Sequence, residues 1–286
     1  MSAWAELGEI DRIIATTLAE DLAVGDLTSR LTVPADAQAR GRILAKQALC
    51  FCGGPVIART FAAVDPAIEV EVRVAEGAHV EAGTEVARLR GPARGLLAGE
   101  RSALNLLGRA CAVATLTRTY VAAAGPALRV VDTRKTMPGL RALDRYAVRM
   151  GGGHNHRNDL GAGVLIKENH IRCAGSLRAA VEAAREHAPH TLRVECEVET
   201  LAEVREAIAA GAEALLLDDM DDATLREAVA IAGPKGARRI LLEVSGGITL
   251  ERLPRLATIG VDLVSVGALT HSAVSVDLSL LFEVGE

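Results

Sequence analysis

The chain has 286 residues, of which 50% are hydrophobic, and its formal net charge at pH 7 is −5. A chain this apolar can bury a sizeable core, which excludes general disorder, and at roughly 100–200 residues per domain it forms one large domain or two unequal ones. A negative net charge with only 2% aromatic residues excludes a general nucleic-acid binder, which needs cations and stacking rings.

The sequence contains neither a membrane nor a secretion signal. No stretch approaches the roughly 18–20 apolar residues of a membrane helix, and residues 1–10 lack a basic segment followed by an apolar one. The five cysteines are odd in number and too scattered for a disulfide framework or paired zinc knuckles, which favours a reduced, cytoplasmic compartment. Cys50 and Cys52 alternate in a strand-like run and are expected to be buried thiols.

The first 94 residues predict a helix followed by a small β-rich domain. Residues 1–20 have helical spacing, with Ile10, Ile13, Ile14 and Leu18 on one face, and a turn-rich stretch follows over 20–29. Short strands are predicted over 42–46, over 68–74 and up to residue 89, separated by glycine turns. The pattern resembles the hammerhead fold of lipoyl and biotinyl carriers. A carrier needs a lysine at a hairpin tip, and Lys46 is the only lysine before residue 135, so a carrier role is not expected.

The remaining residues predict an α/β barrel. After a long helix over 95–125, short aliphatic runs alternate with helical patterns, which indicates a parallel sheet with crossover helices. The absence of a dinucleotide-binding glycine fingerprint favours a barrel over a doubly wound sheet. The runs are 128–132, 163–167, 192–198, 213–218, 239–244 and 261–267. We therefore predict an α/β fold with domains at 1–94 and 95–286, the last segment of which can pack back on the first domain.

Cations follow the first two of these runs. Arg134 and Lys135 come directly after the first run, His156 and Arg157 lie in the glycine-rich loop before the second, and Lys167 ends it. Functional groups of a barrel collect at the carboxyl ends of its strands. Converging cations bind a polyanion, and the planar fork of arginine suits a flat carboxylate. The spacing predicts an anion-binding rim, although an Arg-Lys pair taken alone is as often a surface pair.

The charge distribution along the chain agrees with such a rim. Residues 94–172 contain 13 basic and 5 acidic residues, whereas residues 173–233 contain 5 basic and 13 acidic ones. The net charges of +8 and −8 indicate either a basic patch facing an acidic one across a site or a chance distribution of solvated helix faces.

Carboxylates follow the next runs. Glu197 and Asp218 end neighbouring strands, an arrangement that suits Mg²⁺, which takes oxygen ligands and usually a substrate phosphate. Glu195, Glu197 and Glu199 share one strand face, where burying all three would be costly without cations. A zinc site at His154 and His156 is not expected, because no third ligand has suitable spacing.

Glycine turns follow the last two runs. Ser245, Gly246 and Gly247 are expected to open a helix, and Gly267 and Ala268 come after the last strand. Bare N–H groups and a helix N-terminus form the usual phosphate site of a barrel, although Ser-Gly-Gly alone is also an ordinary strand-to-helix turn. With the cations and carboxylates, these turns predict a phosphorylated substrate, a Mg²⁺-bound leaving group and a carboxylated second substrate.

These motifs resemble the quinolinate phosphoribosyltransferase family, also called carboxylating nicotinate-nucleotide pyrophosphorylases, over nearly the whole chain. The resemblance rests on residues 20–29, 99–105, 132–141, 151–157, 165–170, 195–199 and 245–247. It implies a β-rich domain joined to an incomplete α/β barrel, assembled as a dimer or as a hexamer of dimers. The implied reaction converts quinolinate and phosphoribosyl pyrophosphate, with Mg²⁺, into nicotinate mononucleotide, CO₂ and pyrophosphate in de novo NAD biosynthesis.

The resemblance also implies a role for each candidate residue. Arg134, His156 and Arg157 would bind the quinolinate carboxylates, together with Arg101 from the neighbouring subunit. Lys135 and Lys167 would contact quinolinate or pyrophosphate, and Glu197 and Asp218 would serve Mg²⁺ and the ribose. The 5′-phosphate would be held by Ser245, Gly246, Gly247 and Gly267, next to Ala268.

The sequence departs from the family pattern at three places. Family members often have Asp-Asn where this chain has Asp218-Asp219, Asp where it has Ala162, and two serines where it has Val244-Ser245. The first departure touches a metal or ribose contact, whereas the other two read as tolerated variation.

Three other functions compete with this interpretation. A molybdenum-associated paralogue shares the Thr-Arg-Lys segment but generally lacks the patterns at 155–157 and 166–170, which this chain keeps. A Schiff-base aldolase would use Lys167, but needs an apolar pocket around it. A non-catalytic binding module would leave the charged rim of the barrel without a role.

Overall fold

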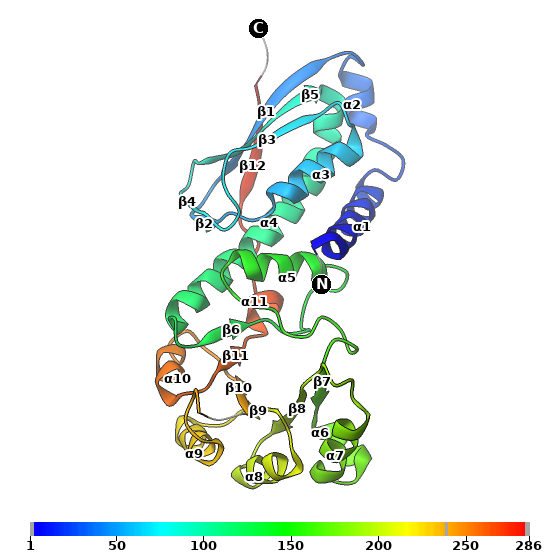
Figure 1. Ribbon diagram of the computed structural model, residues 1–286. Coiled ribbons are helices and arrows are strands. Elements are labelled where there is room, and N and C mark those ends of the chain that lie inside the picture. The colour runs from blue at the N-terminus through cyan, green and yellow to red at the C-terminus, as the bar shows by residue number, and fades with distance from the viewer. Residues whose placement is uncertain (1–2, 238–239, 284–286) are drawn as a thin grey trace. The chain divides into compact units, whose positions relative to one another are not determined.

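The structure is a computed structural model that describes residues 3–237 and 240–283, apart from the side chains of residues 3–7 (Figure 1). The chain forms two compact units. The first comprises Met1–Arg118, Thr136–Gly152 and Leu269–Glu286, and the second comprises Thr119–Lys135 and Gly153–Ala268. The domain division at residues 94 and 95 stays a prediction.

The first unit is built on an antiparallel sheet. Its strands are β1 (Gln38–Ala45), β3 (Glu69–Val72), β5 (Glu85–Pro92) and β12 (Leu278–Glu283), in the order β12-β1-β5-β3. The C-terminal β12 pairs with β1, with Ala45 opposite Leu278. A small second sheet joins β2 (Leu49–Cys50) to β4 (His79–Val80). Cys50 and Cys52 are buried, as expected, and all five cysteines are free.

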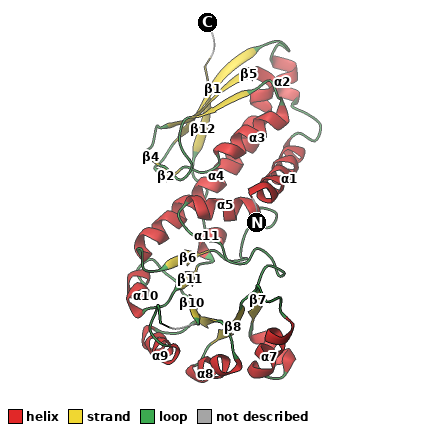
Figure 2. Ribbon diagram, in the orientation of Figure 1, coloured by secondary structure: helices red, strands yellow, loops and turns green. Residues whose placement is uncertain are grey.

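Helices accompany this sheet (Figure 2). They are α1 (Ala3–Asp21), α2 (Leu27–Thr32), α3 (Gly54–Val64), α5 (Arg141–Met150), and most of α4 (Ala93–Ala124) and of α11 (Ala268–His271). Over the described residues α1 confirms the helix predicted for 1–20, and Ile10, Ile13, Ile14 and Leu18 are buried. The sequence predicts only turns where α2 begins. There the Asp26 carboxylate accepts the Ser29 N–H at 3.0 Å and so starts a helix within the turn-rich stretch.

The second unit is an open α/β barrel. Six parallel strands lie in the order β6-β11-β10-β9-β8-β7, and each falls within one of the six predicted runs or begins or ends within a residue of it. They are β6 (Arg129–Val131), β7 (Val164–Ile166), β8 (Val194–Val198), β9 (Ala214–Asp218), β10 (Leu241–Ser245) and β11 (Leu263–Ser265). The end strands β6 and β7 do not pair with each other, which confirms the incomplete barrel.

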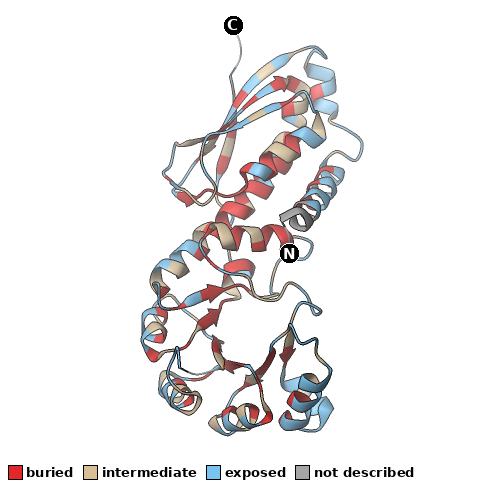
Figure 3. Cartoon of the chain, in the orientation of Figure 1, coloured by how far each residue is buried: buried red, intermediate tan, exposed pale blue. Residues whose placement is uncertain are grey.

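Helices cover the outer side of this sheet. They are α6 (Glu168–Ala174), α7 (Leu177–His187), α8 (Leu201–Ala210), α9 (Asp222–Ala232) and α10 (Leu253–Ile259). Figure 3 shows buried strands and helices whose outer faces are exposed. Within the described ranges, none of the helices combines the length and the apolar character needed to cross a membrane.

Candidate active site

A cavity of about 410 Å³ lies at the carboxyl ends of the barrel strands. Eight of the predicted site residues line it, so side chains from the ends of five different strands surround one cavity. The eight are Arg134, Lys135, His156, Arg157, Lys167, Glu197, Asp218 and Ser245. Gly246, Gly247, Gly267 and Ala268 are not among its lining residues, and Arg101 is an exposed residue of α4 in the first unit.

Two arginines share this cavity. Burial lowers the pKa of Arg157, and the positive charge of Arg134 lowers it further. Arg157 also donates to the Gly163 carbonyl at 3.2 Å. Two half-buried arginines that line one cavity and repel each other form a site that an anion would stabilise.

A cation and a carboxylate already pair within the cavity. The Lys167 ammonium lies 2.6 Å from the Glu197 carboxylate, and the Glu197 side chain is largely buried. Lys167 stands at the end of β7 and caps α6, where its N–H donates to His170 Nδ1 at 2.9 Å. The Lys167 side chain is therefore held at the rim by its strand and helix, with its charge directed at β8.

Asp132 fixes the loop that carries His156 and Arg157. Its side chain is fully buried directly after β6, and its carboxylate accepts the His156 N–H and the Asn155 amide, each at 2.7 Å. The backbone of His154 also pairs with β6, opposite Val131. The loop is thus anchored along the unpaired edge of the first barrel strand.

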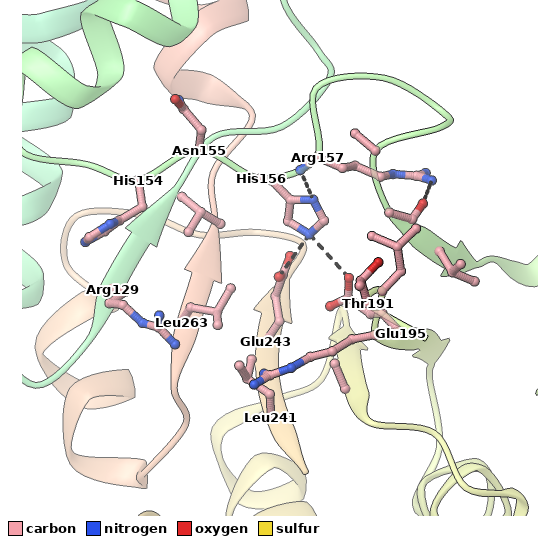
Figure 4. A pocket seen from close by; sticks show the side chains of 17 residues that line it. Arg129, His154, Asn155, His156, Arg157, Thr191, Glu195, Leu241, Glu243 and Leu263 are labelled. Atoms are coloured by element: carbon pink, nitrogen blue, oxygen red, sulfur yellow. Dashed lines mark hydrogen bonds and ion pairs between the residues drawn. The ribbon is translucent and has the colours of Figure 1, made fainter. Parts of the chain in front are cut away.

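The His156 ring reaches from this loop to two other strands (Figure 4). Its Nε2 lies 3.3 Å from a carboxylate oxygen of Glu195 in β8 and 3.2 Å from one of Glu243 in β10. On its other side, Nδ1 accepts the backbone N–H of Arg157 at 2.7 Å. Both ring nitrogens therefore contact protein groups.

The two carboxylates favour a proton on the ring nitrogen that faces them. Burial opposes a charge on the ring, but the Glu195 and Glu243 carboxylates outweigh it and raise the pKa of His156. Burial also raises the pKa of Glu195. Because the Arg157 N–H occupies the Nδ1 lone pair, the ring proton lies on Nε2, facing the two carboxylates.

His156, Glu195 and Glu243 are also close enough together to surround a cation, with ligand atoms within 4.8 Å of one another. A metal ion would need the lone pair of Nε2, which moves the ring proton to Nδ1. That nitrogen already accepts a backbone N–H, so the geometry favours a proton between these groups over a metal ion.

Sequence reasoning missed Glu243. It is only 2% exposed, and its buried Oε1 has no hydrogen-bond partner among the residues that the structure describes. The available signal was a lone carboxylate inside the aliphatic run of β10, since an ionised group in a buried strand needs a partner. Its partner comes from a loop almost 90 residues earlier in the sequence, which periodicity cannot reveal.

The glycine turn after β10 packs against the turn after β9. Asp219 has a positive φ of 52°, and its N–H donates to the Ser245 carbonyl at 3.1 Å. Gly246 has a φ of +81°. The expectation that Ser245-Gly246-Gly247 opens a helix is wrong, because α10 begins only at Leu253, after a turn.

A second cavity, of about 510 Å³, lies at the opposite ends of the same strands. It is lined by residues at strand starts, including Arg129, Val164, Arg193, Ala214, Leu241 and Leu263. His156, Arg157 and Glu243 line both cavities. The buried His156 unit therefore stands between the two ends of the barrel interior.

Comparison with known proteins gives one consistent result. The family model for the quinolinate phosphoribosyl transferase C-terminal domain matches residues 113–281, and that for the N-terminal domain matches residues 26–111. The chain is 39% identical over 273 residues to a probable carboxylating nicotinate-nucleotide pyrophosphorylase of Bacillus subtilis, covering 95% of this chain and 93% of that protein. It is 40% identical to the Mycobacterium leprae carboxylating nicotinate-nucleotide pyrophosphorylase, covering 93% of this chain and 95% of that one.

Solved structures agree with these relatives. The nicotinate-nucleotide pyrophosphorylase of Francisella tularensis superposes with a TM-score of 0.90 at 35% identity, covering 96% of each chain. That of Ehrlichia chaffeensis gives a TM-score of 0.89 at 31% identity, covering 95% of this chain and 98% of the other.

Proposed function

Because the chain belongs to the quinolinate phosphoribosyltransferase family, we propose that it transfers the phosphoribosyl group of phosphoribosyl pyrophosphate to quinolinate with loss of CO₂. The products are nicotinate mononucleotide and pyrophosphate, as in NAD biosynthesis, and the enzyme is a pentosyltransferase. The observation that carries the proposal is the cavity at the carboxyl ends of the strands, where four cations and three carboxylates converge.

The arginine end of the cavity suits the acceptor. Quinolinate carries two adjacent carboxylates on a flat ring, and two guanidinium forks can each meet a carboxylate in its plane. Arg134 and Arg157 supply those forks, and the repulsion between their charges favours binding of a dianion. Their role is to orient the ring nitrogen toward C1 of the ribose, which is mainly an effect of positioning. His156 contributes through its backbone and ring contacts on this side.

The carboxylate end of the cavity suits Mg²⁺. Glu197 and Asp218 end the paired strands β8 and β9 and line the same space, so both carboxylates are available from neighbouring positions. Two protein oxygens leave further positions for water and substrate phosphate, as Mg²⁺ prefers. Bound there, Mg²⁺ would neutralise charge on the departing pyrophosphate.

Lysine charges complete the leaving-group side. Lys167 is held by Glu197 in the free protein, and Lys135 is exposed beside Arg134. We propose that both ammonium groups contact the pyrophosphate or a quinolinate carboxylate when substrates bind, as charge develops on the leaving group. The 5′-phosphate is assigned to Ser245, Gly246, Gly247 and Gly267, next to Ala268, because the backbone N–H groups of glycine turns can approach an anion closely.

The bond changes of the reaction require no nucleophilic side chain. The ring nitrogen forms a bond to C1 while the bond from C1 to the pyrophosphate oxygen breaks. Loss of CO₂ leaves its electron pair on the ring carbon beside the nitrogen that becomes positively charged, and this carbon takes up a proton from water. The chain's task is to hold a dianion and a polyphosphate in contact, which its cations and carboxylates can do.

We also propose a homo-oligomer, a dimer or a hexamer of dimers, in which the exposed Arg101 enters the partner's acceptor site. A reduced, cytoplasmic compartment is proposed from the five free cysteines.

A product assay tests the proposed function. Purified protein is incubated with Mg²⁺, phosphoribosyl pyrophosphate and either quinolinate or nicotinate, and nicotinate mononucleotide and CO₂ are followed. Product from quinolinate alone is expected, because the second carboxylate is both a binding group and the group that is lost. Absence of product from both acceptors, with folded protein, would overturn the proposal and favour the paralogous phosphoribosyltransferase with a different acceptor.

A further inference from the structure

Glu195 and Glu243 occupy a position that the reaction does not itself require. Both face the barrel interior from the middle of their strands, and both approach the same nitrogen of His156. Glu243 is 2% exposed, and its second oxygen, Oε1, has no hydrogen-bond partner in the described part of the chain. Two buried carboxylates on one ring nitrogen cost solvation energy, so their presence points to a role in holding that ring.

The ring in turn holds the backbone of Arg157. Its Nδ1 accepts the Arg157 N–H at 2.7 Å, which is possible only while the ring proton is on Nε2. The two carboxylates keep it there, because each accepts a hydrogen bond from Nε2 and neither can donate one in its ionised form. The tautomer of His156 and the placement of Arg157 are therefore linked.

We propose that Glu243, with Glu195, is a positioning residue that fixes the Nε2–H tautomer of His156 and thereby holds Arg157 in place for the acceptor dianion before it binds. The acceptor named here rests on the proposed function. The linkage from Glu243 to Arg157 does not, because it concerns contacts within the free protein. The acceptor site is thus held in place before the acceptor binds, both by strands β8 and β10 and by the loop that carries Arg157.

The kinetic test compares two substitutions of Glu243 in the full-length protein. Glu243→Leu removes both acceptor oxygens at similar size, whereas Glu243→Gln keeps one. We expect the KM for quinolinate to rise about tenfold or more in Glu243→Leu and less in Glu243→Gln, as for loss of a hydrogen bond between charged groups. The KM for phosphoribosyl pyrophosphate should stay within about twofold of that of the wild type, since its proposed ligands lie on other strand ends.

Leu242→Ala provides the matched control. Leu242 is the neighbour of Glu243 in β10, is fully buried, and points to the opposite face of the sheet. Its truncation lowers stability without touching His156, so both KM values should stay near those of the wild type. An equal rise in the quinolinate KM in Leu242→Ala, or an unchanged KM in Glu243→Leu, would overturn the proposal.

A spectroscopic test needs no activity. The ¹⁵N shifts of the His156 ring in the free wild-type protein should report a protonated Nε2 and an unprotonated Nδ1, and Glu243→Leu should populate the other tautomer. A ring already protonated on Nδ1 in the wild type would overturn the proposal even if Glu243→Leu does not fold. Absence of quinolinate turnover by the wild type would count against the proposed function and leave this measurement as the test of the linkage.

Discussion

The backbone of Asp219 lies so close to Gly246 that a Cβ on Gly246 would stand 2.9 Å from the Asp219 nitrogen. The φ of +81° at Gly246 adds a second reason for glycine, and the positive φ of Asp219 itself is one that asparagine and aspartate tolerate best. This contact keeps the turns after β9 and β10 together at the cavity rim.

Gly246→Ala should therefore destabilise the protein by about 2–4 kcal/mol and raise the KM for phosphoribosyl pyrophosphate. Gly236→Ala is the matched control, because Gly236 has a φ of +87° but no atom within 4 Å of the added Cβ. Urea unfolding and initial rates measure both effects. Equal losses of stability in the two variants would show that the contact with Asp219 does not matter.

Arg134→Ala should raise the KM for quinolinate and lower kcat/KM by about 10- to 100-fold, the effect of removing a charge-assisted hydrogen bond to a carboxylate. Arg129→Ala, at the other end of the same strand, removes the same charge from the second cavity and should leave the kinetics unchanged. Steady-state rates with varied quinolinate measure this. Unchanged kinetics in Arg134→Ala would remove that arginine from the acceptor site.

Glu197→Gln should raise the Mg²⁺ concentration needed for half-maximal activity about tenfold, because one anionic oxygen ligand is lost. It also releases Lys167 from its contact at 2.6 Å. The comparison is Glu199→Gln, an exposed carboxylate at the end of the same strand that does not line the cavity. Activity titrated with Mg²⁺ gives the result, and identical titrations for the two variants would contradict the assignment.

Arg101→Ala and Arg134→Ala should each lose most of their activity at quinolinate concentrations below the KM when purified alone. If Arg101 enters the partner's site, a mixed dimer of the two variants contains one intact site. Random reassociation of equal amounts should then restore about one quarter of the wild-type activity. Activity that stays at the level of the single variants would place Arg101 outside the partner's site.

Periodicity and strand-end chemistry predicted much of this molecule. The aliphatic runs correspond to β6–β11, and the residues that follow them, from Arg134 to Ser245, line one cavity because parallel strands end at one edge. One feature depends on a contact across the fold, because the role of Glu243 follows only from its contact with a ring from the 153–157 loop. The helix α2 is encoded locally by its Asp26 cap, but it is too short for hydrophobic periodicity to reveal it within a turn-rich stretch.

The strand β6 lies at one end of the open barrel. The loop that brings His156 and Arg157 to the cavity also runs along the free edge of β6, where Asp132 N–H bonds to the His154 carbonyl and His154 N–H bonds to that of Val130. A ligand held by this loop therefore stabilises, by mass action, the hydrogen bonds that join the loop to β6. The amide protons of Asp132 and His154 should exchange with solvent more slowly when a ligand occupies the cavity. Exchange at these two amides would then measure the fraction of the protein that holds ligand.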